Sequence, residues 1–488
     1  MVRSLWLHGH GQCVVYTESM TTDLCFLPAV ELVRLLRNKE VSAREVLSAH
    51  LAQIERVNPK VNAIVTLVAE QAFETADALD AEVVRGQVAG PLHGLPIAHK
   101  DLQNTRGIHT TYGSPIYRDF IPNADSLVVE RLKVAGAITI GKTNVPEFGA
   151  GSQTFNNVFG ATRNPYDLTK TSGGSSGGAA TALACGMIPI ADGSDMGGSL
   201  RNPANFCNVV GLRPSPGRVP SWPVDLGWFT LSVDGPMART VADVALTLSA
   251  LAGPDARSPI SLGDSGNRFA QPLGRDFKGT RVAWVKLGLP YEPEVTQLID
   301  STRGIFESLG CLVEEVEPDF SDADEIFKTW RAWSFEAGLS EEYSDHKDKL
   351  KDTVVWNIEQ GLSLTGPQLA RVEIKRTRLF HRIREFMEKF EFLILPVSQV
   401  LPFDVEKPYP TEINAEKMST YIDWMKSCYY ISTIGHPALS VPGAFSASGL
   451  PVGVQIVGRH RDDWGVLQLG YAFEQASQLW KRHPKIAL

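Results

Sequence analysis

The stretch KTSGGSSGGAATALACGMIPIADGSDMGGSLRNPANFCNVVGLR, residues 170–213, decides the fold of this chain. It contains two glycine-flanked serine sites, GGSSGG at 173–178 and GGSLR at 197–201. Glycine allows backbone angles and close approaches that a β-carbon would block. The apolar run between the two sites, 179–191, predicts a buried helix followed by a short strand over 187–191. Because the fold can bring together two loops at the ends of one helix–strand unit, we expect a functional site here.

The bulk composition places the chain among ordinary globular proteins. It has 488 residues, of which 43% are hydrophobic and 21% charged. A formal net charge of −8 argues against an extended nucleic-acid groove, and no apolar run reaches the roughly 18 residues of a membrane span. The six cysteines lack CxxC or zinc-like spacing, which favours free thiols in a reducing compartment. We therefore expect a cytoplasmic protein without nucleic-acid or membrane partners.

The N-terminal segment differs from the remainder of the chain. Residues 1–19 have a single basic residue and a short apolar patch interrupted by HGHG, which makes a poor signal peptide. Met20 stands just before sequence with helical periodicity. We interpret residues 1–19 as an extension without a structural role and residues 20–488 as one domain.

The order of predicted elements indicates the fold class. A helical lead-in occupies residues 28–84, and residues 321–391 are predicted to be mostly helical. Short apolar strands separated by helices are predicted at 95–100, 137–140, 187–191, 209–213, 281–285, 311–316, 392–396, 438–442 and 452–457. This alternation favours an α/β/α sandwich with a central mixed, mostly parallel sheet covered by helices. The motifs concentrate in a core of about 90–250, which makes 321–391 a helical insertion.

One stretch matches a nucleotide-binding motif in the spacing of its residues but not in its predicted secondary structure. GAITIGKT, residues 136–143, matches the P-loop pattern G-x-x-x-x-G-K-[ST]. That loop requires a strand before its first glycine and a helix at its lysine, whereas here a helix precedes Gly136 and the intervening residues are strand-like. The motif therefore predicts a strand and no nucleotide site.

A second pattern matches the nucleophile elbow of esterases. Residues 174–178, GSSGG, fit G-x-S-x-G and would make Ser176 the nucleophile of an α/β-hydrolase. The segment before it is polar and makes a poor strand. His436 or His460 would have to complete a triad, and neither has a distinctive acid before it. This esterase alternative stays open at the level of the sequence.

Three further motifs, in order, resemble those of the amidase signature family of serine hydrolases. PLHGLPIAHKD resembles the strand that ends on the family's catalytic lysine, which places that role on Lys100. TSGGSSGG matches the motif of the bridging serine, which sits on a cis peptide in the family, at Ser175. GSDMGGSLRNPA matches the nucleophile motif and places the nucleophile at Ser199, 24 positions after Ser175, the family's usual separation.

The resemblance extends over most of residues 28–475 through VVGLRPSPGRV, GPMARTVADVA and GHPALSVP...GLPVGVQIVG. It implies hydrolysis of a carboxylic amide C–N bond through an acyl-enzyme, without cofactor or metal. It also implies that Lys100 takes the proton of Ser175, which takes that of Ser199. One base then serves both steps, because the relay runs backwards to protonate the departing nitrogen.

The chemistry explains why a lysine in a dry setting is needed. A serine hydroxyl is a weak nucleophile until a base takes its proton. Lysine can be that base only when neutral, and its ordinary pKa is near 10.4. Burial lowers a lysine pKa because desolvation penalises the charged form. Lys100 ends the apolar strand LPIAHK, which suits that requirement, although a structural pair with the adjacent Asp101 is the alternative.

The nucleophile loop also offers donors for the oxyanion. Successive backbone N–H groups at Met196, Gly197, Gly198 and Ser199 are expected to form the oxyanion hole. Four further residues are expected to support the site: Ser176, Ser194, Asp195 and Arg201. Arg201 either holds the loop or faces the substrate.

The substrate pocket is predicted from position and polarity. The family lines its acyl pocket where this chain has FGAGSQTF, and a tryptophan-bearing segment follows the signature region. The expected substrate-binding residues are Phe148, Gly149, Ala150, Ser152, Trp222 and Phe229. An uncharged pocket with aromatic edges favours small aryl or alkyl amides, anilides or carbamates, and possible esters, over anionic or glutamine-like substrates.

Two other classes of function stay open at this level. The family also resembles an amidotransferase component that makes ammonia from glutamine and works only in a complex on charged tRNA. A nucleotide-binding protein without catalysis is the third class. The expected partner is a small amide or carbamate, and the expected state is a monomer or homodimer.

Overall fold

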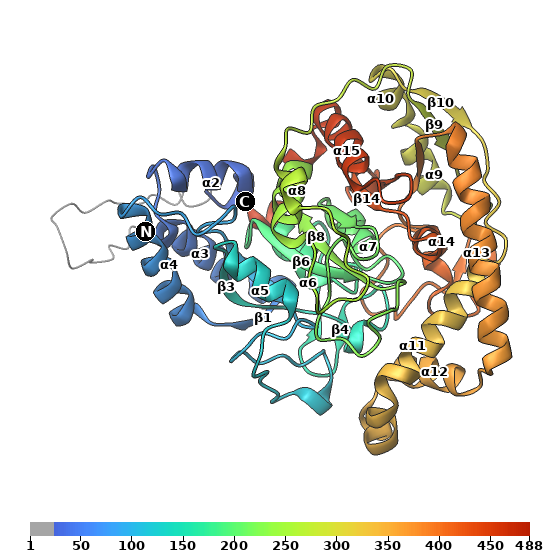
Figure 1. The fold of residues 1–488 in the computed structure, drawn as a ribbon, viewed down its shortest axis with the longest axis horizontal. Helices are drawn as coiled ribbons and strands as arrows, with labels where there is room; N and C mark the ends of the chain where they lie inside the picture. Colours follow the sequence, from blue (N-terminus) through green and yellow to red (C-terminus); the bar gives the residue numbers. More distant parts are fainter. Residues whose placement is uncertain (1–23) are drawn as a thin grey trace.

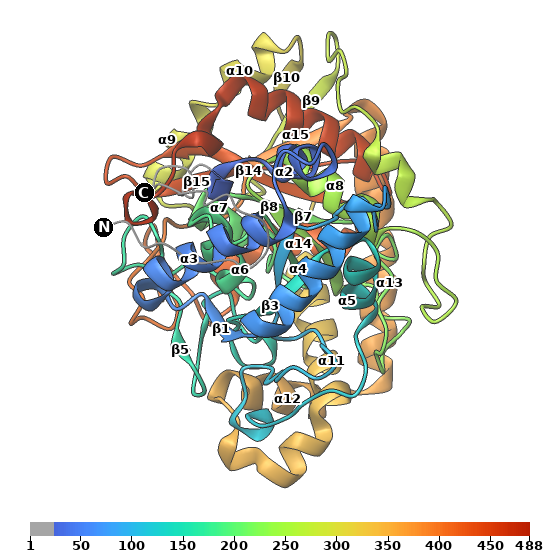
Figure 2. The ribbon, with the colours of Figure 1, turned by 90° about the vertical axis from the view of Figure 1, so that its left-hand side faces the viewer.

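The computed structural model describes residues 24–488 (Figure 1). The extension expected over residues 1–19 lies outside the described residues. The described chain opens with three helices, α2 Ala29–Arg37, α3 Ala43–Val61 and α4 Ala69–Val84. They lie together on one side of the molecule and face the viewer in Figure 2.

Helix α3 begins at a capping box and ends beyond a proline. Ser42 and Glu45 form a capping box, in which the Ser42 Oγ accepts from the Glu45 N–H at 3.1 Å and the Ser42 N–H donates to Glu45 Oε2 at 2.8 Å. The helix contains Pro59 and continues to Val61. A proline in the last turn removes few helical hydrogen bonds, and the left-handed Asn62 (φ 54°) ends the helix instead.

A small sheet carries the predicted lysine strand. Its order is β1-β3-β2, with β1 at Ile64–Leu67, β3 at Ile138–Thr143 and β2 at Pro96–Lys100. β2 and β3 are parallel, and β1 runs antiparallel to β3. All five residues of β2 are buried, so the lysine at its end is held inside the protein.

The large sheet has eight strands in the order β10-β9-β11-β15-β14-β7-β8-β6. Their bounds are β6 Ile190–Asp195, β7 Val210–Arg213, β8 Val233–Ala238, β9 Arg281–Trp284, β10 Leu312–Glu315, β11 Phe392–Pro396, β14 Ala438–Phe445 and β15 Pro451–Val457. Two two-stranded ribbons lie outside it: β4 Phe155–Asn156 with β5 Gly160–Ala161, and β12 Glu412–Ile413 with β13 Glu416–Lys417.

The sheet is mixed, as predicted, but its neighbouring strands are not mostly parallel. Only β10–β9 and β9–β11 pair in parallel, and the other pairs of the large sheet are antiparallel. Helices separate β9, β10 and β11 in the chain, which allows the crossovers that parallel pairing needs. β14 and β15 are joined by a short turn over 446–450, and such a connection makes neighbours antiparallel.

Helices cover both faces of the large sheet. On β14, Leu439 and Val441 point toward Gly470 of α15, whereas Ser440 lies on the side of Asn205 of α7. Alternate residues of a strand point to opposite faces, so α15 and α7 lie on opposite sides. The covering helices are α5 Leu127–Val134, α6 Gly177–Ala184, α7 Arg201–Cys207, α8 Val241–Leu251, α9 Pro293–Asp300, α10 Arg303–Ser308, α14 Lys426–Ile434 and α15 Asp463–Ser477. The α/β sandwich is thereby confirmed.

The predicted helical segment contains three helices, α11 Ala323–His346, α12 Asp352–Leu362 and α13 Gly366–Lys389. Figure 1 shows them at the end of the molecule opposite α2, α3 and α4. Among residues 24–488, no helix combines the length and apolarity that crossing a membrane requires. The five cysteines in this range are buried free thiols.

Candidate functional site

The first serine loop stands at the N-terminus of α6, and its Gly174–Ser175 peptide bond is cis. Ser152 holds this bond in place, since its Oγ donates to the Gly174 carbonyl oxygen at 2.8 Å. Ser175 and Ser176 are both buried. The loop is therefore fixed by contacts from outside its own sequence.

The second serine loop connects β6 to α7. The predicted strand over 187–191 is displaced, because β6 covers Ile190–Asp195 and so delivers Asp195 to the start of the loop. The Asp195 carboxylate accepts from the N–H of Gly198 at 2.9 Å and from that of Leu200 at 3.1 Å. One buried carboxylate thus folds the loop that presents Ser199.

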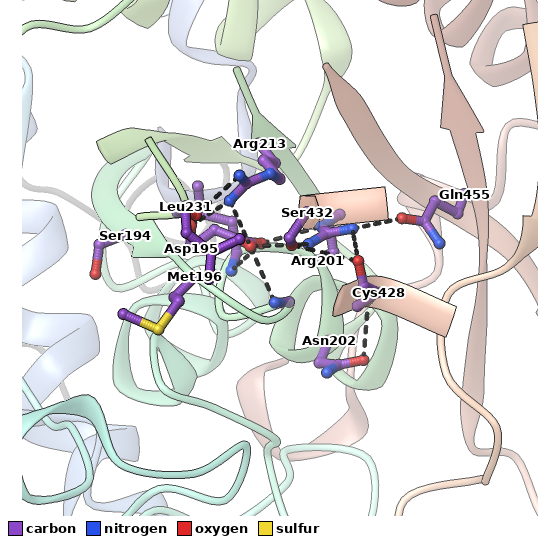
Figure 3. A network of polar contacts seen from close by, with 12 residues as sticks. Ser194, Asp195, Met196, Arg201, Asn202, Arg213, Leu231, Cys428, Ser432 and Gln455 are labelled. Carbon is purple, nitrogen blue, oxygen red and sulfur yellow. Dashed lines mark hydrogen bonds and ion pairs between the residues drawn. The ribbon is translucent and has the colours of Figure 1, made fainter. Parts of the chain in front are cut away.

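Two arginines hold that carboxylate (Figure 3). Arg201 contacts it through Nε at 3.0 Å and Nη2 at 2.8 Å, and Arg213 through Nη1 at 3.2 Å. Burial raises the pKa of Asp195, but the charges of the two arginines outweigh it and hold that pKa well below its usual range. All three side chains are fully buried, so the group is a closed ion network.

Arg201 anchors the loop to the C-terminal part of the chain. Its Nη1 donates to the Cys428 carbonyl at 2.9 Å and to Gln455 Oε1 at 2.7 Å, and its Nη2 donates to Ser432 Oγ at 2.9 Å. Arg201 therefore holds the loop and does not face the substrate.

The two serine loops meet as expected. The Ser176 N–H donates to the Ser199 carbonyl oxygen at 3.2 Å. Ser199 is partly exposed, and its Oγ makes no hydrogen bond to any residue within 24–488. A hydroxyl that is accessible and not engaged is suited to attack a substrate.

Lys100 lies beneath both loops. Its Nζ is 2.8 Å from Ser175 Oγ, 2.9 Å from Ser176 Oγ and 3.0 Å from Ser194 Oγ. No carboxylate of the described chain is in ion-pair contact with it. Its Nζ also lies 3.4 Å from the Ser194 carbonyl oxygen. Because a hydroxyl can both donate and accept, these partners can accommodate a neutral amine, which has two N–H donors and one lone pair.

The environment of Lys100 favours this neutral form. Burial lowers its pKa to about 7, while the negative charges of Asp234, Asp195 and Asp192 raise it. The alternative of a structural pair with Asp101 is wrong. Asp101 instead accepts from the hydroxyl of Thr111 at 2.5 Å.

His99, adjacent to the lysine, is structural. Its Nδ1 bonds Asp192 Oδ1 at 2.8 Å, and its Nε2 bonds Thr139 Oγ1 at 3.0 Å. Asp192 also accepts from the Lys100 backbone N–H at 3.1 Å. Since Asp192 lies on β6, this pair fixes the small sheet against the large one.

The expected oxyanion hole needs one correction. The Gly198 N–H is already engaged by Asp195, so it is not free to meet a substrate oxygen. The N–H groups of Met196, Gly197 and Ser199 donate to no residue within the described part of the chain. Gly198 has φ +117°, and a β-carbon there would lie 2.6 Å from the β-carbon of Cys428. Its glycine is required for shape.

The expected acyl-pocket loop lies beside the serines. A β-carbon on Gly149 would be 3.5 Å from Ser175 Oγ, which places this loop next to the site. Phe148 is partly exposed and stacks on Tyr112, with ring centroids 6.3 Å apart. Ala150 has no exposed surface and packs in an apolar cluster with Phe335. Phe148 and Gly149 thus lie on the side of Ser175, whereas Ala150 lines a small separate pocket together with Ser152.

Ser152 was expected to contact substrate and has a different role. Its Oγ donates to Gly174 and accepts from Asn202 Nδ2 at 3.0 Å. Both hydrogen-bonding directions are used within the protein, and the side chain is buried. Ser152 positions the cis-peptide loop.

Trp222 and Phe229 lie at a separate cavity. This cavity has a volume of about 350 Å³ and is also lined by Ser194 and Asp234. The loop 148–152 does not contribute to its wall. The expected substrate-binding residues thus lie in two neighbouring places, which meet at Leu102 and Tyr112.

One residue near the site carried no recognisable signal in the sequence. Arg331, on α11, is buried, and its Nη1 lies 3.3 Å from the Sδ of Met196. Its Nη2 donates to the Tyr421 hydroxyl at 2.7 Å and its Nε to Asn357 Oδ1 at 3.1 Å. It stands far from every motif in the sequence, so only the packing of α11 reveals it.

The other serine and lysine motifs do not form sites. Ser176 has no exposed surface, and His436 bonds the Gly458 carbonyl at 2.9 Å rather than a serine. The esterase alternative therefore lacks an accessible nucleophile. Lys142 of the P-loop-like motif lies within β3 and bonds Thr105 Oγ1 at 2.9 Å, in agreement with the strand interpretation.

Residues 24–488 contain no cluster of three or more metal-ligating side chains. The site rests on amine, hydroxyl and backbone groups, and these can supply a base, a relay, a nucleophile and oxyanion donors.

Comparison with known proteins agrees with this chemistry. The family model described as Amidase matches residues 45–467. An acylamidase of Rhodococcus erythropolis is 34% identical over 93% of this chain and 96% of its own length. A component of the glutamyl-tRNA(Gln) amidotransferase of Carboxydothermus hydrogenoformans is 34% identical over 95% of this chain and 100% of its own.

Among solved structures, a bacterial aryl acylamidase of the amidase signature family superposes with a TM-score of 0.89. It shares 29% identity over 95% of this chain and 98% of its own. A 6-aminohexanoate cyclic dimer hydrolase has a TM-score of 0.87 and 25% identity over 96% and 100% of the two chains. With the family model matched along nearly the whole chain, the protein belongs to the amidase signature family and is a hydrolase of amide C–N bonds.

Proposed function

We propose that Ser199 is the nucleophile, Ser175 the relay and Lys100 the base of this amidase. The observation that carries the proposal is the buried Lys100 amine, which contacts three hydroxyls and no carboxylate. With a pKa near 7, a large share of Lys100 is neutral at physiological pH. It takes the Ser175 proton while Ser175 takes that of Ser199, and the serine oxygen attacks the amide carbon.

The same relay completes the reaction. N–H groups of Met196, Gly197 and Ser199 receive the oxyanion, with Gly198 as the glycine that shapes the loop. The protonated lysine returns its proton through Ser175 to the departing nitrogen, which leaves an acyl-enzyme on Ser199. Water, deprotonated by the same relay, then hydrolyses the ester and frees the serine.

The proposed substrates are small aryl or alkyl amides, anilides or carbamates, with esters as a side activity. Phe148 and Gly149 lie on the side of Ser175, and Trp222 and Phe229 give aromatic side chains to the adjoining cavity, whose wall also includes polar residues such as Ser194 and Asp234. The acylamidase relatives support this substrate class. Residues 20–488 would act as one domain with a helical insertion, as a cytoplasmic monomer or homodimer without nucleic acid or membrane.

A second candidate function is supported by the amidotransferase relatives. Amidotransferase components of that kind match this chain over their full length at the same level of identity as the acylamidase. The two functions differ in what the isolated chain can do. A free-standing amidase turns over amides alone, whereas a glutaminase component needs a stoichiometric partner.

The test combines a substrate panel with trapping of the acyl-enzyme. The purified chain is assayed on anilides, primary amides, carbamates and glutamine, and mass spectrometry locates the covalent adduct. We expect turnover of uncharged amides, an adduct on Ser199, and loss of activity by at least about 10³-fold in Ser199→Ala. Exclusive turnover of glutamine, or full activity of the alanine variant, would contradict the proposal.

A further inference from the structure

The cavity beside Lys100 has a polar inner end. Its wall includes Ser194, whose Oγ contacts the Lys100 amine at 3.0 Å. Asp234 is also part of this wall. Asp234 lies on β8 directly opposite Ser194 on β6, in register within the antiparallel pair. The carboxylate of Asp234 is therefore the neighbour of a group that touches the base.

Asp234 has only neutral hydrogen-bond partners. Its Oδ1 accepts from Gln103 Nε2 at 2.8 Å, and its Oδ2 accepts from Ser221 Oγ at 2.5 Å. Within residues 24–488 it makes no ion pair with a lysine or arginine. Burial raises the pKa of this carboxyl, and the positive charge of Lys100 lowers it.

The other two carboxylates that influence Lys100 are engaged by groups of the neighbouring elements. Asp192 on β6 bonds His99 on β2 and the Lys100 backbone. Asp195 is neutralised by Arg201 and Arg213 in the network of Figure 3.

The remaining charged groups come from the strand next to β2 and from the loop after it. Lys142 on β3 has a pKa lowered to about 8 by burial, and the charge of Asp101 raises it. Asp101 itself is satisfied by Thr111. Of all these groups, the Asp234 carboxylate is the largest electrostatic influence that favours protonated Lys100.

We propose that Asp234 is a positioning residue for the general base, because its uncompensated carboxylate holds the proton on Lys100 and thereby sets the lower end of the active pH range. The inference rests on the proposed role of Lys100. Asp234 acts through the field across the strand pair and touches neither nucleophile nor relay. Without this charge, the amine loses its proton at a lower pH, and the enzyme becomes active there.

The experiment measures kcat/KM of the full chain against pH with an uncharged amide. The ascending limb reports the base of the free enzyme. In Asp234→Asn, an isosteric change that preserves partners for Gln103 and Ser221, we expect this limb to move down by about 0.5–1 pH unit. Asp225→Asn is the matched control, since it removes the same charge from an exposed position in the loop that lines the cavity. The ascending limb of the Asp225→Asn profile should coincide with that of the unsubstituted protein.

Further variants separate the inference from the proposed function. Asp234→Ser removes the charge with a smaller side chain, and the final extent of covalent labelling at Ser199 reports on the folded fraction of either variant. A limb that stays in place or moves up in both variants would overturn the inference. If Lys100→Ala kept full turnover, the proposed relay itself would fail. An inactive Lys100→Ala with an unmoved Asp234→Asn limb would reject the inference alone.

Discussion

At the scale of single residues, the proposed mechanism depends on a lysine that is costly to bury. Lys100 has no exposed surface and no ion pair, and its amine contacts three hydroxyls and the Ser194 carbonyl oxygen, all of them neutral. Burial without a counter-ion is what lowers its pKa to about 7. In the proposed mechanism, this costly burial supplies a base at physiological pH.

The free-energy cost of burying Lys100 has a predictable pH dependence. The pKa of Lys100 is lower in the folded protein than in the unfolded chain, so above pH 7 the unfolded state binds more protons and stability rises with pH. We predict that the free energy of unfolding, relative to that of Lys100→Met, increases between pH 7 and pH 10 by up to about 1.4 kcal/mol per unit.

Urea unfolding of both proteins at several pH values measures this difference, and all other titrating groups cancel in it. A difference that is flat over this range would show that Lys100 stays protonated in the folded protein.

Asp195 is buried like Lys100, but it is charged and forms ion pairs. Replacing Asp195 by asparagine leaves Arg201 and Arg213 buried without their shared anion. We predict a loss of about 3–5 kcal/mol in the free energy of unfolding. The catalytic loop should also lose its order, since its N–H groups at 198 and 200 depend on this carboxylate.

Denaturant unfolding together with single-turnover acylation measures both effects. Asp264→Asn is the control, because Asp264 pairs with Arg218 from an exposed position. An Asp195→Asn protein with unchanged stability would contradict the role of the network.

At the scale of elements, the local signals in the sequence stabilise helices that are distant from the chemistry. The capping box of α3 is one of them, and it satisfies backbone donors at the start of a 19-residue helix. We predict that Ser42→Ala lowers the free energy of unfolding by about 1 kcal/mol. It should leave kcat and KM unchanged, because α3 contributes no side chain to the site.

Thermal unfolding tests the predicted loss of stability in Ser42→Ala, and steady-state kinetics test whether its kcat and KM are unchanged. Ser48→Ala, on the exposed side of the same helix, removes a hydroxyl without removing a cap and serves as control. A change in kcat for Ser42→Ala would mean that α3 is coupled to the catalytic loops.

At the scale of the whole molecule, the helical insertion is connected to the catalytic loop. Arg331 reaches from α11 to Met196 and at the same time binds Asn357 on α12 and the hydroxyl of Tyr421. Tyr421 also accepts from Asn357 at 2.6 Å. Three distant segments therefore converge behind one of the oxyanion donors.

We predict that Arg331→Met lowers kcat/KM by about 10-fold or more, since a displaced donor costs a few kcal/mol in the transition state. The loss should be mainly in kcat if the donor acts on the oxyanion. Lys347→Met removes a cation from an exposed pair with Glu359 at the far end of α11 and should have no effect. Kinetics of both variants on one uncharged amide decide the matter, and equal activities would exclude coupling of the insertion to the site.

Short motifs in the sequence were enough to indicate the fold class and to nominate catalytic residues. The resemblance of the lysine strand and the two glycine–serine loops to family motifs nominated Lys100, Ser175 and Ser199, and Lys100 and Ser175 lie in contact while Ser199 lies on the adjoining loop. Helical periodicity indicated the helical region that contains α2, α3 and α4, and the alternation of strands and helices indicated the sandwich. These features are local, because they depend on backbone propensity and on residues close together in the chain.

Only the tertiary structure decided which residues that are distant in the sequence contact one another. The sequence could not show that Gly198 donates to Asp195, that Ser152 supports Gly174, or that Arg331 stands behind Met196. Nor could it give the antiparallel pairing of most neighbouring strands in the large sheet, which depends on how connections cross the sheet. Alternating strands and helices permit several strand orders, and the charges around Lys100 become neighbours only after one of these orders is chosen by packing.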